Sequence, residues 1–274
     1  MSVPPVKPSS PPPGMPRFDA GAAWTSAVAI IKANRELLTV IAGLFFLLPQ
    51  LVIAFLIPEP PAGLEEDAQA EAILAILSSW WPVWLIGLIA IGMGMLAMIV
   101  LITGRDRPTV GEALQRGLKA LPSLIAAQLV VVAGVGLGML LIMVPFSLGG
   151  QALAGVGLIG ALVFAAWIYA RTLLIAPVLA GEGLRNPFEA IMKSWQMSRG
   201  NAGRLLGFFL LLLLANTVIY LVATSIPAAI AIVLGGQLAG KIVSAVMGSL
   251  IAAIFSLIST AVLTAAWAQL KPKG

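Results

Sequence analysis

The chain has 274 residues, of which 60% are hydrophobic and only 10% charged, with a formal net charge of +5. A soluble protein of this size cannot hide so much apolar surface, because much of its own surface must stay in water. The basic residues flank apolar stretches and form no continuous basic face, so a nucleic acid partner is not expected. Cysteine and histidine are absent, which excludes disulfides, thiolate metal sites and histidine-based chemistry. We expect neither a metal nor a cofactor.

The first 16 residues contain seven prolines. This composition predicts a disordered cytoplasmic tail that leans towards polyproline conformation and acts either as a solubilising segment or as a ligand for a proline-reading partner. The first apolar run begins at Leu37 and, at about 21 residues, is too long for the apolar region of a cleaved signal peptide. Residues 17–270 are then expected to form a single transmembrane domain.

Six apolar stretches follow, and each has the roughly 20 residues that a helix needs to cross about 30 Å of hydrocarbon. They predict an all-α polytopic membrane protein with six transmembrane helices. Small residues at a spacing of four, as in Gly134-x-x-x-Gly138 and Gly157-x-x-x-Ala161, predict seams where neighbouring helices pack closely. The spans are expected at 37–57, 83–103, 123–146, 153–176, 205–226 and 242–267.

The charge of the connections alternates along the chain. All sixteen basic residues except Lys241 fall on one side of the expected spans, and the other side carries the acidic run Glu65-Glu66-Asp67. The positive-inside rule therefore places both termini in the cytoplasm. The acidic run is interpreted as a solvated outer loop, with a divalent cation site as the less favoured alternative.

The chain also reads as three copies of one unit, each made of a short amphipathic segment and two spans. Every odd-numbered span ends with an apolar residue before a proline, at Pro58, Pro145 and Pro227. Because each unit holds two spans, the units 18–103, 108–180 and 187–268 would be parallel repeats about an axis along the membrane normal. Their opening segments place apolar residues at helical spacing: Trp24, Val28 and Ile31, then Val110, Leu114, Leu118 and Leu121, then Phe188, Ile191, Met192 and Trp195.

These amphipathic segments have two interpretations. They lie in the inner headgroup region beside anionic lipid, or they form tight cytoplasmic caps packed on the helices. The interfacial interpretation is favoured because Trp24 and Trp195 suit that depth. Lys193 and Arg199 would then lie near anionic headgroups, as would Lys32, Arg116 and Lys119.

The third unit carries a longer pattern. The sequence reads Arg171-Thr-Leu-Leu-Ile-Ala-Pro177, then Gly181-Glu-Gly183, then Asn186-Pro-Phe-Glu-Ala-Ile-Met-Lys-Ser-Trp195 and Arg199-Gly-Asn201 before a long apolar span. This resembles the membrane domain fused to some glycerophosphoryl diester phosphodiesterases and the stand-alone YciC-like inner-membrane proteins, most clearly over about 165–226. The resemblance implies a six-helix bacterial inner-membrane protein with a role in envelope or lipid homeostasis. The phosphodiesterase activity belongs to a soluble barrel domain, and the histidines it needs are absent here.

Arg171 is the one charge that falls inside an expected span, and it is the candidate ligand residue. An arginine at mid-bilayer costs at least about 2.5–3.5 kcal/mol, so such a residue is a functional candidate by default. Its planar guanidinium suits a phosphate or lipid headgroup. As the nineteenth residue from Leu153, it has the alternative of lying at the inner interface and extending its charge to water.

Three functions follow from these observations. The favoured one is a non-enzymatic integral membrane protein that acts as an accessory, assembly or lipid-homeostasis factor, with membrane lipids and other membrane proteins as partners. The alternative is a transporter or channel for a lipid-like or small apolar molecule, although no Asp or Glu falls within a span to relay protons. An intramembrane enzyme is the least favoured, because histidine-based sites and paired intramembrane aspartates are missing. No catalytic residue is assigned.

Overall fold

The computed structural model describes residues 17–58, 60–61, 63, 65–104, 106 and 108–271, and this part of the chain contains helices and no strand. The expected tail over 1–16 lies outside the described residues. Among the described residues, five stretches are long and apolar enough to cross a membrane: Arg35–Leu56, Trp81–Thr103, Val110–Ser147, Gln151–Glu182 and Ala202–Leu270. The helices are α1 (Ala20–Ala33), α2 (Arg35–Ala42), the π-helical turn η1 (Gly43–Leu47), α3 (Leu48–Leu56), α4 (Glu66–Ser79), α5 (Trp81–Thr103), α6 (Val110–Ser147), α7 (Gln151–Thr172), α8 (Ile175–Glu182), α9 (Pro187–Met197) and α10 (Ala202–Leu270).

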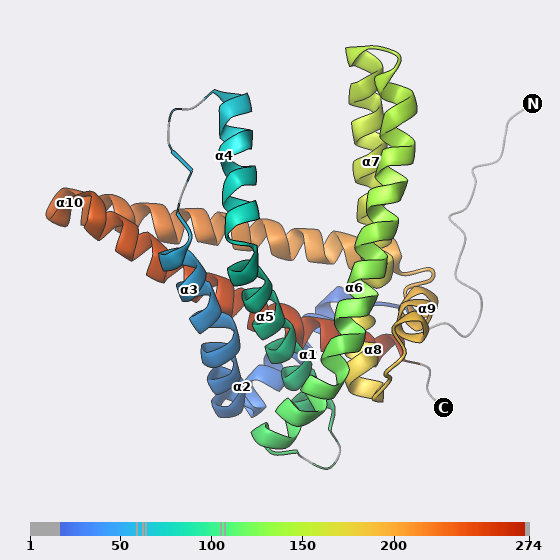
Figure 1. The fold of residues 1–274 in the computed structure, drawn as a ribbon. Helices are drawn as coiled ribbons and strands as arrows, with labels where there is room; N and C mark the ends of the chain where they lie inside the picture. Colours follow the sequence, from blue (N-terminus) through green and yellow to red (C-terminus); the bar gives the residue numbers. More distant parts are fainter. Residues whose placement is uncertain are drawn as a thin grey trace, which may run out of the picture.

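Figure 1 shows a compact base from which three arms project. Helices α3, α4 and α5 form one arm, α6 and α7 form a second, and α10 extends sideways as a third. The base gathers α1, α8, α9 and the inner ends of the longer helices. The arms therefore diverge from a shared foundation and do not form a parallel bundle.

The arms expose apolar side chains along most of their length. On α6 and α7, Leu129, Leu141, Ile159 and Val163 are all more than 60% exposed. A soluble protein rarely exposes a contiguous apolar surface of this extent, because its hydration is unfavourable. A lipid environment removes that penalty, and the exposure of these helices is that of a membrane protein.

The connection between the first two expected spans differs from the expected outer loop. Glu66, Asp67 and Glu71 lie on helix α4, which runs almost directly into α5 through Trp80. The segment is rich in alanine, leucine and glutamate, which favour helix, and its two acids in the first turn complement the positive end of the helix dipole. Because the sequence of α4 favours helix, the helical part of this arm extends well beyond the expected span 83–103.

Helix α10 is two helices joined at a break. Gly236 has φ 77° and ψ −176°, which interrupts the helical backbone. The halves on either side fold back on each other, because Tyr220 from the first half lies against Gly248 of the second. A side chain at Gly248 would begin only 3.0 Å from the Tyr220 hydroxyl oxygen. The last apolar stretch is therefore a helical hairpin.

The same four residues form the tip of two arms. Leu148-Gly-Gly-Gln151 joins α6 to α7, and Leu234-Gly-Gly-Gln237 joins the halves of α10. The second glycine has nearly the same backbone conformation in both: φ 91°, ψ 175° at Gly150 and φ 77°, ψ −176° at Gly236. Only glycine adopts this region readily, since a Cβ atom clashes there.

Phenylalanines fill the predicted seam between α6 and α7. A Cβ atom added at Gly138 would lie 2.2 Å from Phe164, and one added at Gly157 would lie 2.6 Å from Phe146. Glycine at these positions lets a ring from the opposite helix reach the backbone. The packing prediction is confirmed at Gly138 and Gly157, whereas Gly134 has nothing within 4 Å of its added Cβ.

The short helix α8 lies at the centre of the base. Ile175, Val178 and Leu179 are at most 1% exposed, and Ala176 and Pro177 are buried as well. A helix that is apolar all round is stable only when it is surrounded by protein or lipid, and burying each large side chain contributes about 1.5–3 kcal/mol. At its end, Gly181 approaches the buried ring of Trp267 so closely that an added Cβ would lie 2.8 Å from it.

The three segments that open the predicted repeats are helical, as α1, the start of α6, and α9. They differ in how they join the following span. Segment α1 is separated from α2 by Asn34, α9 is separated from α10 by a turn through Gly200, and the second continues without a break into α6. The threefold repeat stays a prediction, which the shared tips of the second and third units support.

The two tips generate a prediction about stability. Gly150→Ala and Gly236→Ala should each lower the free energy of unfolding by about 1–3 kcal/mol, because alanine must adopt a strained conformation. Gly134→Ala is the matched control, since it lies within a helix with open space around it and should be neutral or stabilising by up to about 1 kcal/mol. Unfolding of the purified protein in detergent measures all three. If Gly150→Ala and Gly236→Ala lowered the free energy of unfolding no more than Gly134→Ala does, the shared turn geometry would be contradicted.

Candidate functional site

Arg171 lies at the inner end of α7, where it is half-buried between two indole rings. Its guanidinium carbon is 5.5 Å from the ring centre of Trp167 and 5.3 Å from that of Trp195. The two rings meet edge to face at 5.0 Å. The Nη1 atom donates a hydrogen bond of 3.3 Å to the carbonyl oxygen of Trp195, while Nε is buried without a partner. Cation–π contacts of this kind stabilise by about 0.5–2 kcal/mol.

The backbone of Arg171 is held by α9. Helix α7 ends at Thr172, and Pro177 prevents the ladder from continuing because it has no N–H to offer the carbonyl of Leu173. The last carbonyls of α7 therefore need other donors. Ser194 Oγ donates to the Arg171 carbonyl at 2.7 Å and Ser198 Oγ does so at 3.5 Å, and both serines are fully buried.

The other residues expected at the membrane interface fall into two groups. Trp24 on α1 is 42% exposed, and Arg199 is exposed just beyond α9. Trp195 is half-buried against Trp167, and Lys193 forms an ion pair with Glu182 of α8. The structure thus gives Trp195 and Lys193 intramolecular partners, and it brings Arg171, Trp195 and Lys193 together around α9. The interfacial placement stays a prediction, and the exposed Phe188 and Met192 side chains of α9 favour it.

The pattern that resembles a known family has a structural explanation in this region. Gly183 ends α8 in the left-handed conformation, and the Asn186 side chain accepts hydrogen bonds from the backbone N–H groups of Phe188 and Glu189 to begin α9. Pro187 occupies the first turn of α9, where its missing N–H costs nothing. These residues position α8 and α9, and the pattern marks a turn between helices.

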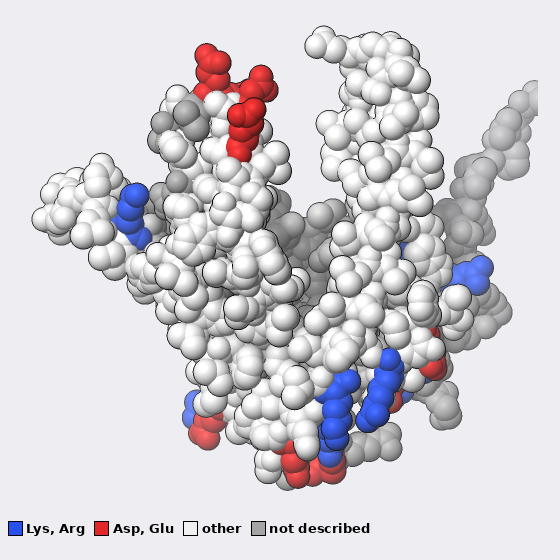
Figure 2. Space-filling view, in the orientation of Figure 1, with Lys and Arg blue, Asp and Glu red and all other residues white. Residues whose placement is uncertain are grey.

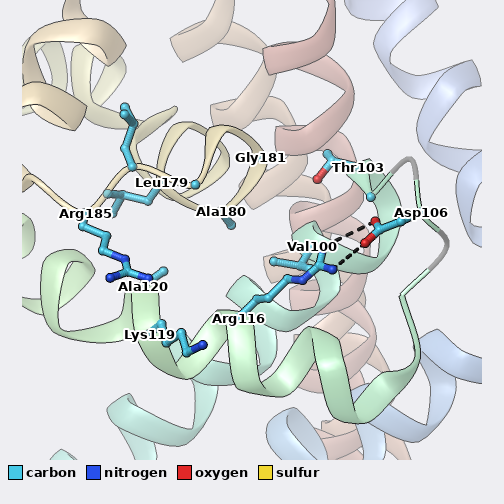
Figure 3. A pocket seen from close by; sticks show the side chains of 13 residues that line it. Val100, Thr103, Asp106, Arg116, Lys119, Ala120, Leu179, Ala180, Gly181 and Arg185 are labelled. Atoms are coloured by element: carbon cyan, nitrogen blue, oxygen red, sulfur yellow. Dashed lines mark hydrogen bonds and ion pairs between the residues drawn. The ribbon is translucent and has the colours of Figure 1, made fainter.

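A pocket of about 340 Å³ opens at the base beside this turn. It lies between the end of α5, the start of α6 and the end of α8 (Figure 3). Arg116, Lys119 and Arg185 follow one another along one rim, opposite Leu179–Gly181 of α8. Ser123 Oγ of α6 donates a hydrogen bond to the Arg185 carbonyl oxygen, which ties the turn after α8 to α6. The remaining walls include Val100, Thr103, Gly104, Ala120, Gly183 and Leu184.

One acid faces the three basic side chains of this pocket. Asp106 forms a two-point ion pair with Arg116, in which Nη1 lies 3.3 Å from Oδ1 and Nη2 bonds Oδ2. The hydrogen bond from Arg116, with help from a backbone hydrogen bond, holds the pKa of the Asp106 carboxyl below its ordinary value. The carboxylate is therefore ionised at neutral pH. Three cations then face one anion in the described lining.

The sequence shows the basic residues that line this pocket, but it does not predict that they come to line one pocket. Arg116 and Lys119 stand out as part of an amphipathic segment, whereas Arg185 gives no signal of its own. The three line one pocket only because the break after α7 brings the end of α8 back against α6. Within the described residues, acids do not gather in any group of three or more that could hold a metal ion.

No protein family, curated protein or solved structure matches this chain significantly.

The environment of Arg171 generates a prediction. Arg171→Lys should lower the free energy of unfolding by about 1 kcal/mol, because lysine keeps the charge and loses the planar group that lies between two rings. Arg171→Ala should cost more, since it also removes the hydrogen bond to Trp195. Thermal unfolding in detergent measures both. Mass spectrometry of retained anionic lipid is the companion measurement. A lysine variant of unchanged stability that loses lipid would show that Arg171 holds a headgroup instead.

Proposed function

We propose that this chain is a non-enzymatic integral protein of a bacterial inner membrane, with six spans and both termini in the cytoplasm, and that it has an accessory role in envelope or lipid homeostasis. The observation that carries the proposal is the distribution of charge. Figure 2 shows charged side chains gathered around the base, acidic ones at the far end of the α4 arm and a basic one on the α10 arm, with mostly uncharged surface between them. The residues at that far end are Glu66, Asp67 and Glu71 of α4.

The positive-inside rule assigns the base to the cytoplasm, because most of its charged side chains are basic ones from α1, α6 and the turns around α9. The far end of the α4 arm is then the outer end. The distance fits, since α6 has 38 residues and at 1.5 Å per residue measures about 57 Å. About 30 Å of this crosses hydrocarbon, and the remainder belongs to the base.

The break in α10 supports the proposal of six spans. Residues 202–235 and 237–270 lie on either side of Gly236, and each, at about 51 Å, is long enough to cross a bilayer. The hairpin then enters and leaves from the same side. This returns the chain to the base, where Gln269 exchanges hydrogen bonds with the backbone of Asp19.

The lipid-related role rests on the surfaces that the chain offers. The arms present apolar side chains to their surroundings, while the base presents basic side chains beside the exposed apolar residues Phe188, Met192 and Leu118. Such a mixture suits the region where lipid headgroups meet acyl chains. The resemblance to the membrane domain of glycerophosphoryl diester phosphodiesterases points to the same class of role.

Single cysteines test the topology cleanly, because the chain has none of its own. Glu66→Cys, Leu148→Cys and Gln237→Cys should react in intact cells with a maleimide that cannot cross the inner membrane. Lys32→Cys should react only after the membrane is opened. All four side chains are exposed, so a lack of reaction reports the membrane and not burial. Protection of Gln237→Cys in intact cells would show that α10 does not cross as a hairpin and would overturn the six-span topology.

The lipid role has a separate test. The full chain, extracted with its surrounding lipid by a membrane-solubilising polymer, should carry more anionic phospholipid than the bulk membrane, because about 1 kcal/mol of attraction accompanies each basic residue near the surface. Lipid mass spectrometry measures the ratio, and another six-span protein from the same membrane is the reference. A lipid composition equal to that reference would contradict the proposed role in lipid homeostasis.

A further inference from the structure

We propose that the pocket between α5, α6 and α8 binds a phosphate group, and that its natural ligand is the headgroup of an anionic phospholipid. The proposal rests on the proposed membrane placement and names the place on the molecule where a lipid is held. Its residues are Arg116, Lys119 and Arg185, with Asp106 as the internal competitor. The shared chemistry is that of a phosphate monoester or diester, so free phosphate is the other possible source.

The first support is the convergence of cations from two separate elements. Arg116 and Lys119 lie three residues apart on one face of α6, and Arg185 reaches the same rim from the turn after α8. Two guanidinium forks and an ammonium group supply the donors that phosphate oxygens accept. The hydrogen bond from Ser123 to the Arg185 carbonyl oxygen holds the backbone of Arg185 against α6, the helix that carries Arg116 and Lys119.

The second support is that an anion already occupies part of the site. The carboxylate of Asp106 meets Arg116 at two points, in the arrangement that a phosphate would adopt with the same fork. Both side chains are about half exposed, at 47% for Arg116 and 56% for Asp106. Because exposed pairs of this kind are weak, an incoming phosphate can displace the carboxylate.

The charge balance of the pocket stays positive. Asp106 cancels one of the three cations. Two positive charges are therefore left for a ligand. A phosphodiester or a phosphate monoester, with one or two negative charges, is attracted to them.

The walls favour a lipid over free phosphate. Val100, Leu179 and Leu184 also line the pocket, and Val100 belongs to α5, which leads into the first apolar arm. A phosphate at the rim would place its attached chains along apolar surface. Free phosphate gains nothing from these walls and must give up its hydration in contact with them.

Native mass spectrometry of the full chain in detergent tests the pocket, with phosphatidylglycerol titrated in one arm and inorganic phosphate in the other. Lys119→Gln and Arg185→Gln should each weaken phosphatidylglycerol binding about fivefold, as expected for one basic residue near a headgroup. Asp106→Asn should strengthen it severalfold, because Arg116 is released. Arg35→Gln, at an exposed basic residue that begins α2 and lies outside the pocket, is the control for overall charge.

Each outcome decides the proposal. Lipid binding that falls in Lys119→Gln and Arg185→Gln, rises in Asp106→Asn and is unchanged in Arg35→Gln supports the headgroup pocket. Phosphate that binds with the same pattern, where lipid does not, supports the anion site and identifies free phosphate as its source. Equal binding by all four variants overturns the pocket, even if the wild-type chain is enriched in anionic lipid, in which case the broader lipid role stands without it. Thermal unfolding of each variant confirms that it is folded.

Discussion

The carbonyl group of Arg171 is the point on which the base of this protein depends. Helix α7 ends at Thr172, so the carbonyl groups of its last turn, that of Arg171 among them, lack their helical donors, in surroundings where an unpaired polar group is costly. Ser194 and Ser198 supply the missing hydrogen bonds, which holds α9 against the end of α7. The chain between them must then double back as α8, and α8 becomes the buried centre of the base. The pocket exists because α8 ends beside α6.

The base and the arms are stabilised by different means. In the base, apolar side chains of α8 pack against the inner end of α10, and Gly181 lets Trp267 approach the backbone. This is ordinary core packing, in which burial and close contact contribute together. Along the arms, pairs of helices meet through glycine and phenylalanine while their outer faces stay exposed. There the surrounding lipid supplies the apolar contact that a core supplies elsewhere.

Sequence reasoning predicted the apolar stretches well because hydropathy depends only on local composition. Each expected span lies, to within one residue, in one of the five apolar helical stretches of the described residues, although 153–176 crosses the break between α7 and α8. Sequence reasoning missed α4, since acids next to a span were interpreted as a loop although the alanine-rich segment favours helix. It singled out Arg171 as the only charge in a span but could not show the two indole rings, because Trp195 is 24 residues away in the chain. The pocket could not be predicted for the same reason, because Arg185 and Arg116 are far apart in the sequence and line one pocket only in the folded chain.

The second and third predicted units are alike at their tips and differ at the base. Both units turn at Leu-Gly-Gly-Gln with the same backbone conformation, so their outer ends follow one pattern. At the base, the second unit continues straight from its amphipathic segment into α6, which carries Arg116 and Lys119 to the pocket. The third unit bends at Gly200, and this frees α9 to turn back and bond the end of α7. The straight segment thus brings Arg116 and Lys119 to the pocket, and the bent one holds α8, which lines the pocket beside them.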